Sequence, residues 1–140
     1  MKRTTRREKA RKGILKGLSP RQNRNIPPLN YQKVYSIKDD FPELEIIING
    51  GIKNISEVKN HLNYVDGVML GRAAYDDPFM LNDVDSEIYA NTKVEICRRD
   101  LLTEYLDYVH IMTKKGYDPK IMLKHIFGLK KGEKDAKRFR

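Results

Sequence analysis

Two glycine-containing turns carry the residue types that most clearly indicate chemistry. The first is Asn49-Gly50-Gly51 and the second is Gly71-Arg72. Glycine lets a ligand approach a backbone amide closely, and the first amides of a following helix carry a positive dipole end. Any strand–helix connection also needs small residues, so either turn alone is weak evidence. Side by side, the two turns predict a phosphate site.

Each turn follows a short apolar stretch that is expected to be a strand. Glu45–Ile48 is β-branched, Asn54–Leu62 after it has a helical pattern, and Gly67–Leu70 repeats the strand. A right-handed crossover would make the two strands parallel neighbours. The last two strands of a (β/α)8 barrel commonly hold phosphate in this way. A nucleotide P-loop is not indicated, because no Gly-Lys-Ser/Thr follows the first strand and no GxGxxG occurs.

Two segments in order carry a resemblance to a known family. They are GLSPRQNRNIPPLNY at residues 17–31 and FPELEIIINGGIKNISEVKNHLNYVDGVMLGRAAYDDPFML at residues 41–81. The sequence resembles the C-terminal part of bacterial tRNA-dihydrouridine synthases, most closely the A-type enzymes, over residues 10–140. The implied fold class is α/β, a C-terminal fragment of a TIM (β/α)8 barrel followed by a small helical domain. The implied family reaction is FMN- and NADPH-dependent reduction of uridine to 5,6-dihydrouridine in tRNA.

The resemblance also assigns site residues. It implies that the FMN phosphate would be held by Asn49, Gly50, Gly51, Gly71 and Arg72. The positions that match tRNA contacts are Arg21, Arg24, Lys137 and Arg140. No catalytic residue is assigned, because the loop with the family's catalytic Cys precedes the matched part. Uridine reduction by this chain alone is therefore not expected, and FMN binding is expected to be weak or absent.

The chain is too short for a whole barrel, and we expect three parts instead. A complete barrel needs about 250 residues, and the chain has 140. We expect a basic, disordered segment at 1–12, the last βα units at 13–77 and a helical tRNA-binding domain at 78–140, divided near residues 77–82. Lys9 stands where the family has a flavin-contacting His, and a buried strand containing Arg6 and Arg7 would be costly to desolvate. The simplest interpretation is a reading frame that begins inside an ancestral gene.

Four further segments have clear local patterns. Gly13 to Asn30 is expected to be a loop because of its glycines and prolines, and Tyr31 to Asp40 a helix with one apolar face. A capping box at Thr92 and Glu95 predicts a long helix to about Lys115. Asp118-Pro119 would cap a last helix that continues to Phe127.

Positive charge is concentrated at the two ends of the chain. Residues 1–24 hold ten Lys and Arg against one Glu, residues 25–129 hold twelve against sixteen acidic residues, and residues 130–140 hold six against two. Such ends suit a polyanion such as tRNA, although basic termini are also commonly just solvated. Two alternatives therefore stay open beside the enzyme fragment: a non-catalytic basic RNA-binding module and a decayed gene product. A separate chain that supplies the missing barrel strands is a further possible partner.

The remaining candidate residues favour ordinary structural roles. Cys97 lies on the apolar face of the expected long helix and is interpreted as a core residue. His61 and His125 have no partner at metal-ligand spacing, so no metal site is predicted. The pairs Asp39-Asp40 and Asp76-Asp77 look like loop or cap carboxylates. A single Cys and the lack of a long apolar run favour a cytoplasmic protein without a membrane span.

Overall fold

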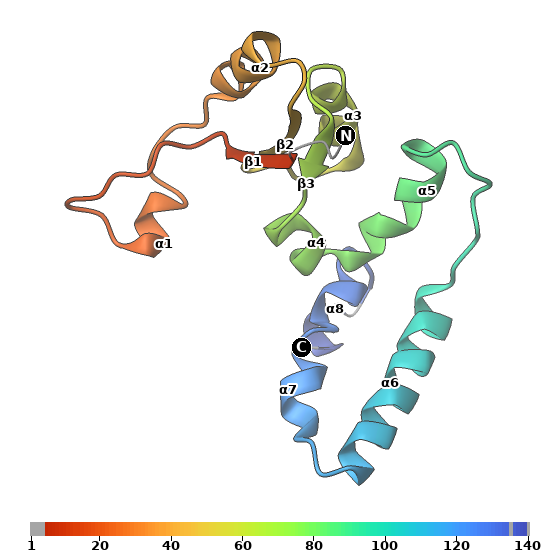
Figure 1. The fold of residues 1–140 in the computed structure, drawn as a ribbon. Helices are drawn as coiled ribbons and strands as arrows, with labels where there is room; N and C mark the ends of the chain where they lie inside the picture. The colour runs from red at the N-terminus through yellow and green to blue at the C-terminus, as the bar shows by residue number, and fades with distance from the viewer. Residues whose placement is uncertain (1–4, 135, 140) are drawn as a thin grey trace. The chain divides into compact units, whose positions relative to one another are not determined.

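The computed structural model describes residues 5–134 and 136–139, which form two compact units (Figure 1). The division lies between Leu70 and Gly71, whereas the sequence had suggested residues 77–82. The earlier division arises because the residues after Gly71 pack with later helices. A Cβ on Gly128 would lie 2.9 Å from the Tyr75 carbonyl oxygen and 2.8 Å from that of Asp76. This close backbone approach places residues 71–76 in the second unit.

The first unit is built on a three-stranded parallel sheet. Its strands are β1 (Thr5–Lys9), β2 (Glu45–Asn49) and β3 (Gly67–Met69), in the order β1-β2-β3. Ile48 pairs with Val68, and helix α3 (Ile55–Leu62) connects β2 to β3. The expected parallel βαβ unit is therefore confirmed, as is the α/β character of the chain.

Strand β1 corrects the expectation of a disordered segment at residues 1–12 for residues 5–9, whereas residues 1–4 lie outside the described part of the chain. The strand pairs along the whole of β2, from Thr5 opposite Glu45 to Lys9 opposite Asn49. The expected desolvation cost does not arise, because Arg6 and Arg7 are exposed rather than buried. Charged side chains are common on edge strands, where they discourage pairing with other chains. The position beside β2 that β3 leaves free is thus filled by β1.

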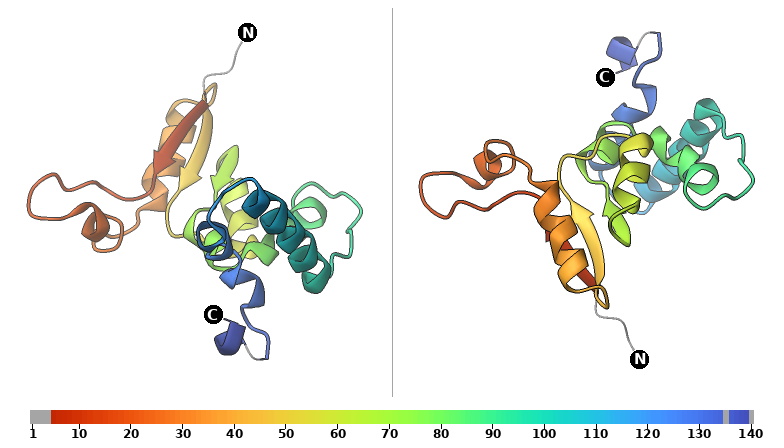
Figure 2. Two further views of the ribbon diagram at one scale, coloured as in Figure 1. Left: turned by 90° about the horizontal axis from the view of Figure 1, so that it is seen from below. Right: turned by 90° about the horizontal axis from the view of Figure 1, so that it is seen from above.

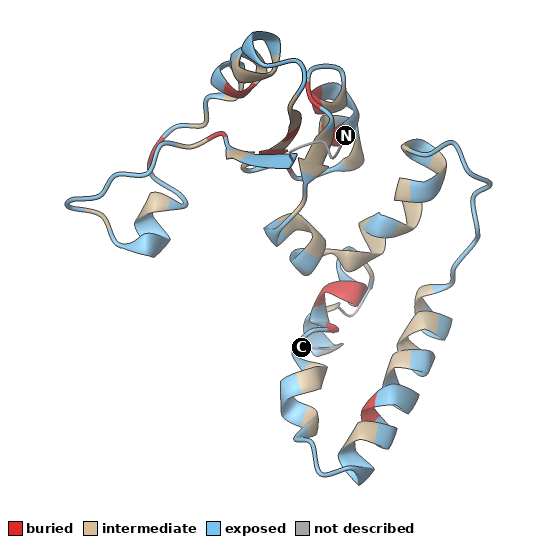
Figure 3. Cartoon of the chain, viewed as in Figure 1, coloured by how far each residue is buried: buried red, intermediate tan, exposed pale blue. Residues whose placement is uncertain are grey.

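Alternate residues of β2 form the centre of the first unit's core. Ile46 and Ile48 are fully buried, whereas Ile47 between them is only half-buried. Figure 3 colours the described residues by their burial. Helix α2 (Tyr31–Asp40) lies across the β1–β2 pair and contributes the buried Val34 (Figure 2). The period of two is what a strand with one well-covered face requires.

A polar contact ties the end of α2 to the starts of β2 and β3. The Lys38 ammonium lies 2.7 Å from the Asp66 carboxylate and also donates to the carbonyl of Leu44. Asp66 in turn accepts a hydrogen bond from the amide of Ile46. The Lys38 head group is therefore bonded within the first unit.

The segment between β1 and α2 contains a short helix that its glycines and prolines had not suggested. Helix α1 (Pro20–Asn23) lies inside the expected loop. Ser19 and Gln22 form a reciprocal capping box, and Pro20 occupies the first turn where its missing amide costs nothing. The Asn23 side chain then bonds both the amide and the carbonyl of Ile14, which closes the segment on itself.

All described elements of the second unit are helical. They are α4 (Arg72–Asp76), the 3-10 helix η1 (Pro78–Asp83), α5 (Val84–Glu87), α6 (Arg98–Lys114), α7 (Pro119–Leu123), the 3-10 helix η2 (Phe127–Lys130) and α8 (Ala136–Phe139). The predicted cap at Asp118 is confirmed, since its side chain accepts from the amide of Lys120. The helix that follows is shorter than expected, because η2 replaces its continuation.

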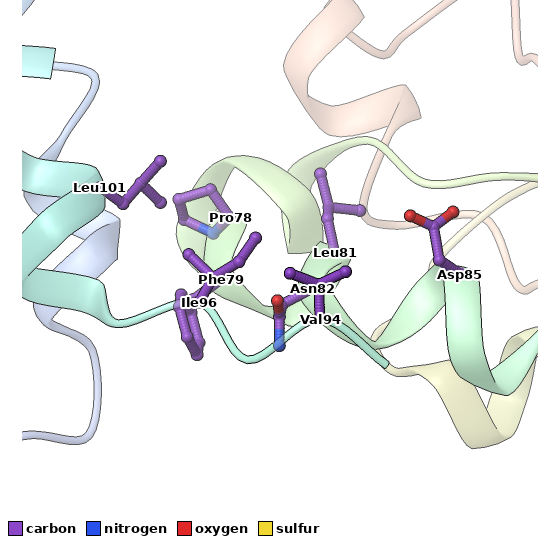
Figure 4. Close-up of a pocket in the computed structure, with 8 residues that line it drawn as sticks. All are labelled: Pro78, Phe79, Leu81, Asn82, Asp85, Val94, Ile96 and Leu101. Atoms are coloured by element: carbon purple, nitrogen blue, oxygen red, sulfur yellow. The ribbon is translucent and has the colours of Figure 1, made fainter. Parts of the chain in front are cut away.

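The long helix α6 begins later than its predicted capping box. Its N-cap is Cys97, and the preceding residues 91–97 are extended and exposed. Lys93 pairs with Asp83 at 2.9 Å, and Val94 and Ile96 line a cavity of about 270 Å³ beside η1 (Figure 4). These contacts of the extended segment with η1 outweigh the local capping signal.

We expect the burial pattern of β2 to appear directly in stability. Ile48→Ala should lower the free energy of unfolding by about 2–5 kcal/mol, because it leaves a cavity at a fully buried site. Ile47→Ala removes the same atoms from a half-buried site and should cost less. Urea denaturation followed by circular dichroism measures both, and equal losses would contradict the assigned strand faces.

Candidate phosphate-binding turn

The turn Asn49-Gly50-Gly51 lies directly after β2. Asn49 is opposite Met69 in the parallel register, so the carboxyl ends of β2 and β3 meet at one edge of the sheet. Gly50 has φ 155° and Gly51 has φ 69°, values that side chains other than glycine rarely allow. Gly51 is exposed, and Gly50 is half-buried. The turn therefore brings glycine backbone to the edge where ligands bind in parallel sheets.

The side chains of Leu29 and Ala10 pack closely against this turn. A Cβ on Gly51 would lie 2.7 Å from Leu29 Cδ1, and one on Gly50 would lie 2.9 Å from Leu29 Cδ2. The Ala10 Cβ, just after β1, would be 3.2 Å from a Cβ on Gly50. The backbone conformation therefore favours glycine at both positions, and the end of the Leu29 side chain would have to move to admit a larger residue.

Hydrogen bonding leaves the two glycine amides available. Within the described part of the chain, the N–H groups of Gly50 and Gly51 donate no hydrogen bond. The Gly50 carbonyl, in contrast, accepts one from the Tyr31 hydroxyl at 2.8 Å. Donors of this kind suit an anion, because the opposing charge of their acceptor strengthens the bond.

The start of helix α3 is already occupied by its own side chains. Asn54 accepts a hydrogen bond from the Glu57 amide, while the Glu57 carboxylate accepts from the Lys53 amide and from the Asn54 side chain. The Asn54 side chain therefore caps the helix, and the Glu57 carboxylate already places a negative charge in the first turn, where the glycine pattern had suggested a phosphate. A phosphate at this turn would therefore use the glycine amides rather than the α3 dipole.

The second turn has an open side. Gly71 is the N-cap residue of α4 and makes no side-chain cap bond, and a Cβ there would meet nothing within 4 Å. Gly71 and Arg72 are both exposed. They belong to the second unit, so their joining with Asn49–Gly51 in one site stays a prediction.

Comparison with known proteins adds to this geometry. The family model described as dihydrouridine synthase (Dus) matches residues 9–140. The chain belongs to the dihydrouridine synthase family. The tRNA-dihydrouridine(20/20a) synthases of Haemophilus ducreyi and Pseudomonas putida are each 44% identical to it over 131 residues, and that of Synechocystis is 43% identical. These matches cover 94% of this chain but only 41%, 39% and 39% of the relatives.

The four family positions assigned to tRNA lie in different parts of the chain. Arg21 lies on α1 and Arg24 is its C-cap residue, and both side chains are exposed. Lys137 lies on α8 in the second unit and is also exposed. Arg140 is outside the described residues. The structure thus places one exposed basic pair in the first unit, and the tRNA role of all four residues stays a prediction.

Two other candidates from the sequence have clear environments. Cys97 is exposed at the start of α6, so the core role expected for it is wrong. Its predicted place on a helix face depended on a helix that began at Thr92. His125 packs edge-on against Tyr75 with ring centroids 5.7 Å apart. No group of His, Cys, Asp and Glu in the described residues could hold a metal ion, and none of their helices is long and apolar enough to cross a membrane.

His61 supports the glycine turn indirectly, by packing against the Tyr31 ring whose hydroxyl bonds the Gly50 carbonyl. The sequence had not suggested this role. His61 is buried, with 6% of its surface exposed, and its Nδ1 lies 2.6 Å from the Tyr35 hydroxyl. The Tyr31 ring packs against it at 4.5 Å with an interplanar angle of 65°. The spacing of Tyr31 and Tyr35 by four residues on α2 was a usable signal, since it places both rings on one face.

Burial controls the titration of this aromatic cluster. Desolvation lowers the pKa of His61 below its ordinary value of 6.5, although Glu57 acts in the opposite direction. Desolvation also raises the pKa of Tyr31 and of Tyr35. The neutral forms of all three side chains are therefore favoured in the folded unit.

We expect the first unit to lose stability in acid through His61. Because the folded pKa lies below 6.5, the unfolded state binds a proton first; the stabilising contribution is full above pH 6.5 and is lost as pH falls through the folded pKa. Urea unfolding midpoints measured from pH 8 to pH 5 should decline in that range. His61→Phe keeps a ring but cannot titrate, so an unchanged pH dependence in this variant would contradict the assignment.

Proposed function

We propose that this chain provides the FMN-phosphate turn and part of the tRNA-contacting surface of a tRNA-dihydrouridine synthase. The observation that carries the proposal is the 44% identity to proteins of that name across 131 residues, which include both glycine turns. The chain spans about 40% of the length of these relatives. We therefore propose that NADPH-dependent reduction of uridine requires protein outside these 140 residues, such as a companion chain with further barrel strands.

The first turn fits a phosphate group in three respects. The amides of Gly50 and Gly51 donate to no other described residue, the turn lies at the carboxyl edge of the sheet, and Gly51 is exposed to an incoming ligand. Asn49, with its half-buried side chain, ends the strand beside them, and Gly71 and Arg72 would add an amide and a cation from the second turn. FMN would supply the hydride chemistry, while these residues would bind and orient its phosphate.

We expect the purified chain to bind FMN weakly and to carry no yellow colour. The turn addresses only the phosphate, and walls for the flavin ring are expected from the family's other strands. Equilibrium binding should nevertheless favour FMN over riboflavin, which lacks the phosphate. Equal binding of the two would contradict the phosphate role of the turn. Stoichiometric FMN after purification would contradict the weak affinity and indicate that a dimer or a partner completes the site.

The basic parts of the chain fit the backbone of tRNA. Arg21 and Arg24 are exposed, and so are Lys12 and Lys16 in the same segment between β1 and α2. We propose that this segment and the helical region at residues 78–140, through Lys137 and Arg140, contact phosphates. Such contacts would position the RNA without reading its sequence. Because tRNA is the proposed partner, we also propose a cytoplasmic location.

We expect a specific decrease in tRNA affinity when the α1 pair is neutralised. Arg21→Gln with Arg24→Gln should weaken binding and reduce the log–log salt slope by about one for each phosphate that is no longer neutralised. Arg6→Gln with Arg7→Gln removes the same charge from exposed positions of β1 and is the matched control. Gel-shift titrations at several salt concentrations measure both. An equal loss of tRNA affinity in the two variants would contradict a specific role of Arg21 and Arg24 and would indicate non-specific charge attraction.

The second candidate function is a basic RNA-binding module without catalysis. It is favoured by the concentration of ten Lys and Arg against one Glu in residues 1–24. Salt-dependent tRNA binding together with no preference for FMN over riboflavin would support it. Absence of both activities would instead support a decayed gene product.

A further inference from the structure

Tyr31 makes a contact that determines which way the glycine turn faces. Its hydroxyl donates a hydrogen bond of 2.8 Å to the Gly50 carbonyl. That carbonyl and the Gly51 N–H belong to one planar peptide unit, and the described chain has no cis peptide bond. In a trans unit, C=O and N–H point in opposite directions. The bond to Tyr31 therefore directs the Gly51 N–H away from the Tyr31 hydroxyl.

A turn of two glycines can otherwise rotate this peptide unit easily. Glycine tolerates both signs of φ, so half a turn of the unit meets little intrinsic resistance. The rotated turn would present the Gly50 carbonyl oxygen in place of the Gly51 N–H. A carbonyl oxygen repels an anion, whereas an N–H attracts one. The orientation of a single peptide unit thus decides whether the turn favours an anion.

We propose that Tyr31 is a positioning residue that holds the Gly50–Gly51 peptide with its N–H toward a phosphate monoester. The identity of the ligand rests on the proposed function, but the orientation of the peptide does not. Tyr31 acts through the backbone of Gly50 and is not assigned a contact with the ligand. Its hydroxyl has no other hydrogen bond among the described residues.

The surroundings of Tyr31 fix its hydroxyl. The ring lies edge-on to buried His61, and His61 is held by its 2.6 Å contact with Tyr35. Leu29 also packs close to the turn, since a Cβ built on Gly51 would lie 2.7 Å from Leu29 Cδ1 and 3.5 Å from the Tyr31 hydroxyl. A packed ring with few rotamers places its terminal oxygen accurately, which a flexible polar side chain would not do.

The test uses the full 140-residue chain, labelled with 15N and 13C. Residual dipolar couplings report the orientation of the Gly51 N–H, and the Gly50 carbonyl 13C shift reports the bond from Tyr31. Tyr31→Phe removes only the hydroxyl and should change both. Tyr105→Phe is the matched control, because it also removes a tyrosine hydroxyl that donates to a backbone carbonyl, that of Met122, but lies in the second unit. It should leave both signals close to those of the unmodified chain.

Titration with inorganic phosphate then measures the consequence for an anion. The Gly51 amide signal should shift in the unmodified chain, and Tyr31→Phe should weaken the fitted affinity by about three- to tenfold, the usual range for one hydrogen bond. Tyr105→Phe should leave the affinity nearly unchanged. Equal weakening in both variants would overturn the proposal, because it would trace the effect to general stability.

The orientation data separate this proposal from the proposed function. If Tyr31→Phe reorients the Gly51 N–H but phosphate shifts no signal even in the unmodified chain, the positioning role stands and the phosphate function fails. An unchanged N–H orientation in Tyr31→Phe overturns the positioning role whatever phosphate does. Should the variant not fold, couplings that place the Gly51 N–H on the Tyr31 side in the unmodified chain would overturn it equally.

Discussion

The parallel pairing of β2 on both of its edges is the constraint on which the first unit depends. Ile46 and Ile48 are completely buried, so the backbone between them is also removed from water. Buried N–H and C=O groups need partners, and a strand obtains them only from its neighbours. β3 supplies one neighbour through the α3 crossover, and β1 supplies the other although its side chains are charged. The backbone N–H and C=O groups of β1 pair with those of β2, while the side chains of Arg6 and Arg7 remain exposed to water.

The same pairing places the glycine turn. Because β1 and β2 end together, the chain after Lys9 brings Ala10 against Gly50, and the Ala10 carbonyl accepts a bond from Asn30. Leu29 and Tyr31, on either side of Asn30, then close over Gly51 and Gly50. The turn is therefore shaped by three segments that are distant in sequence. The close packing of Leu29 and Ala10 is a reason for glycine at these two positions, in addition to any bound ligand.

In the second unit, Arg98 sets the start of the longest helix. Its guanidinium donates to the Leu129 carbonyl at 2.6 Å, lies 4.0 Å from the Phe79 ring centroid and pairs with Glu133 at 3.6 Å. One side chain thus connects α6 with η1 and with the residues around η2. Cation–π and charge-assisted bonds of this kind fix a helix end more firmly than a local cap does. The residues before Arg98 are left extended, in contact with η1.

Residue order alone was enough to predict the βαβ unit, α2, the Asp118 cap and the family, because these depend on residues that are close together or on a long ordered match. The existence of β1, the exposure of Cys97 and the burial of His61 beneath the turn follow only from tertiary packing. Each of these depends on partners far along the chain: β2 for β1, η1 for residues 91–97, and Tyr31 and Tyr35 for His61. Local patterns describe what a segment prefers in isolation. Distant partners decide which preference is kept, because burial and backbone pairing contribute more free energy than a cap or an unfavourable strand propensity.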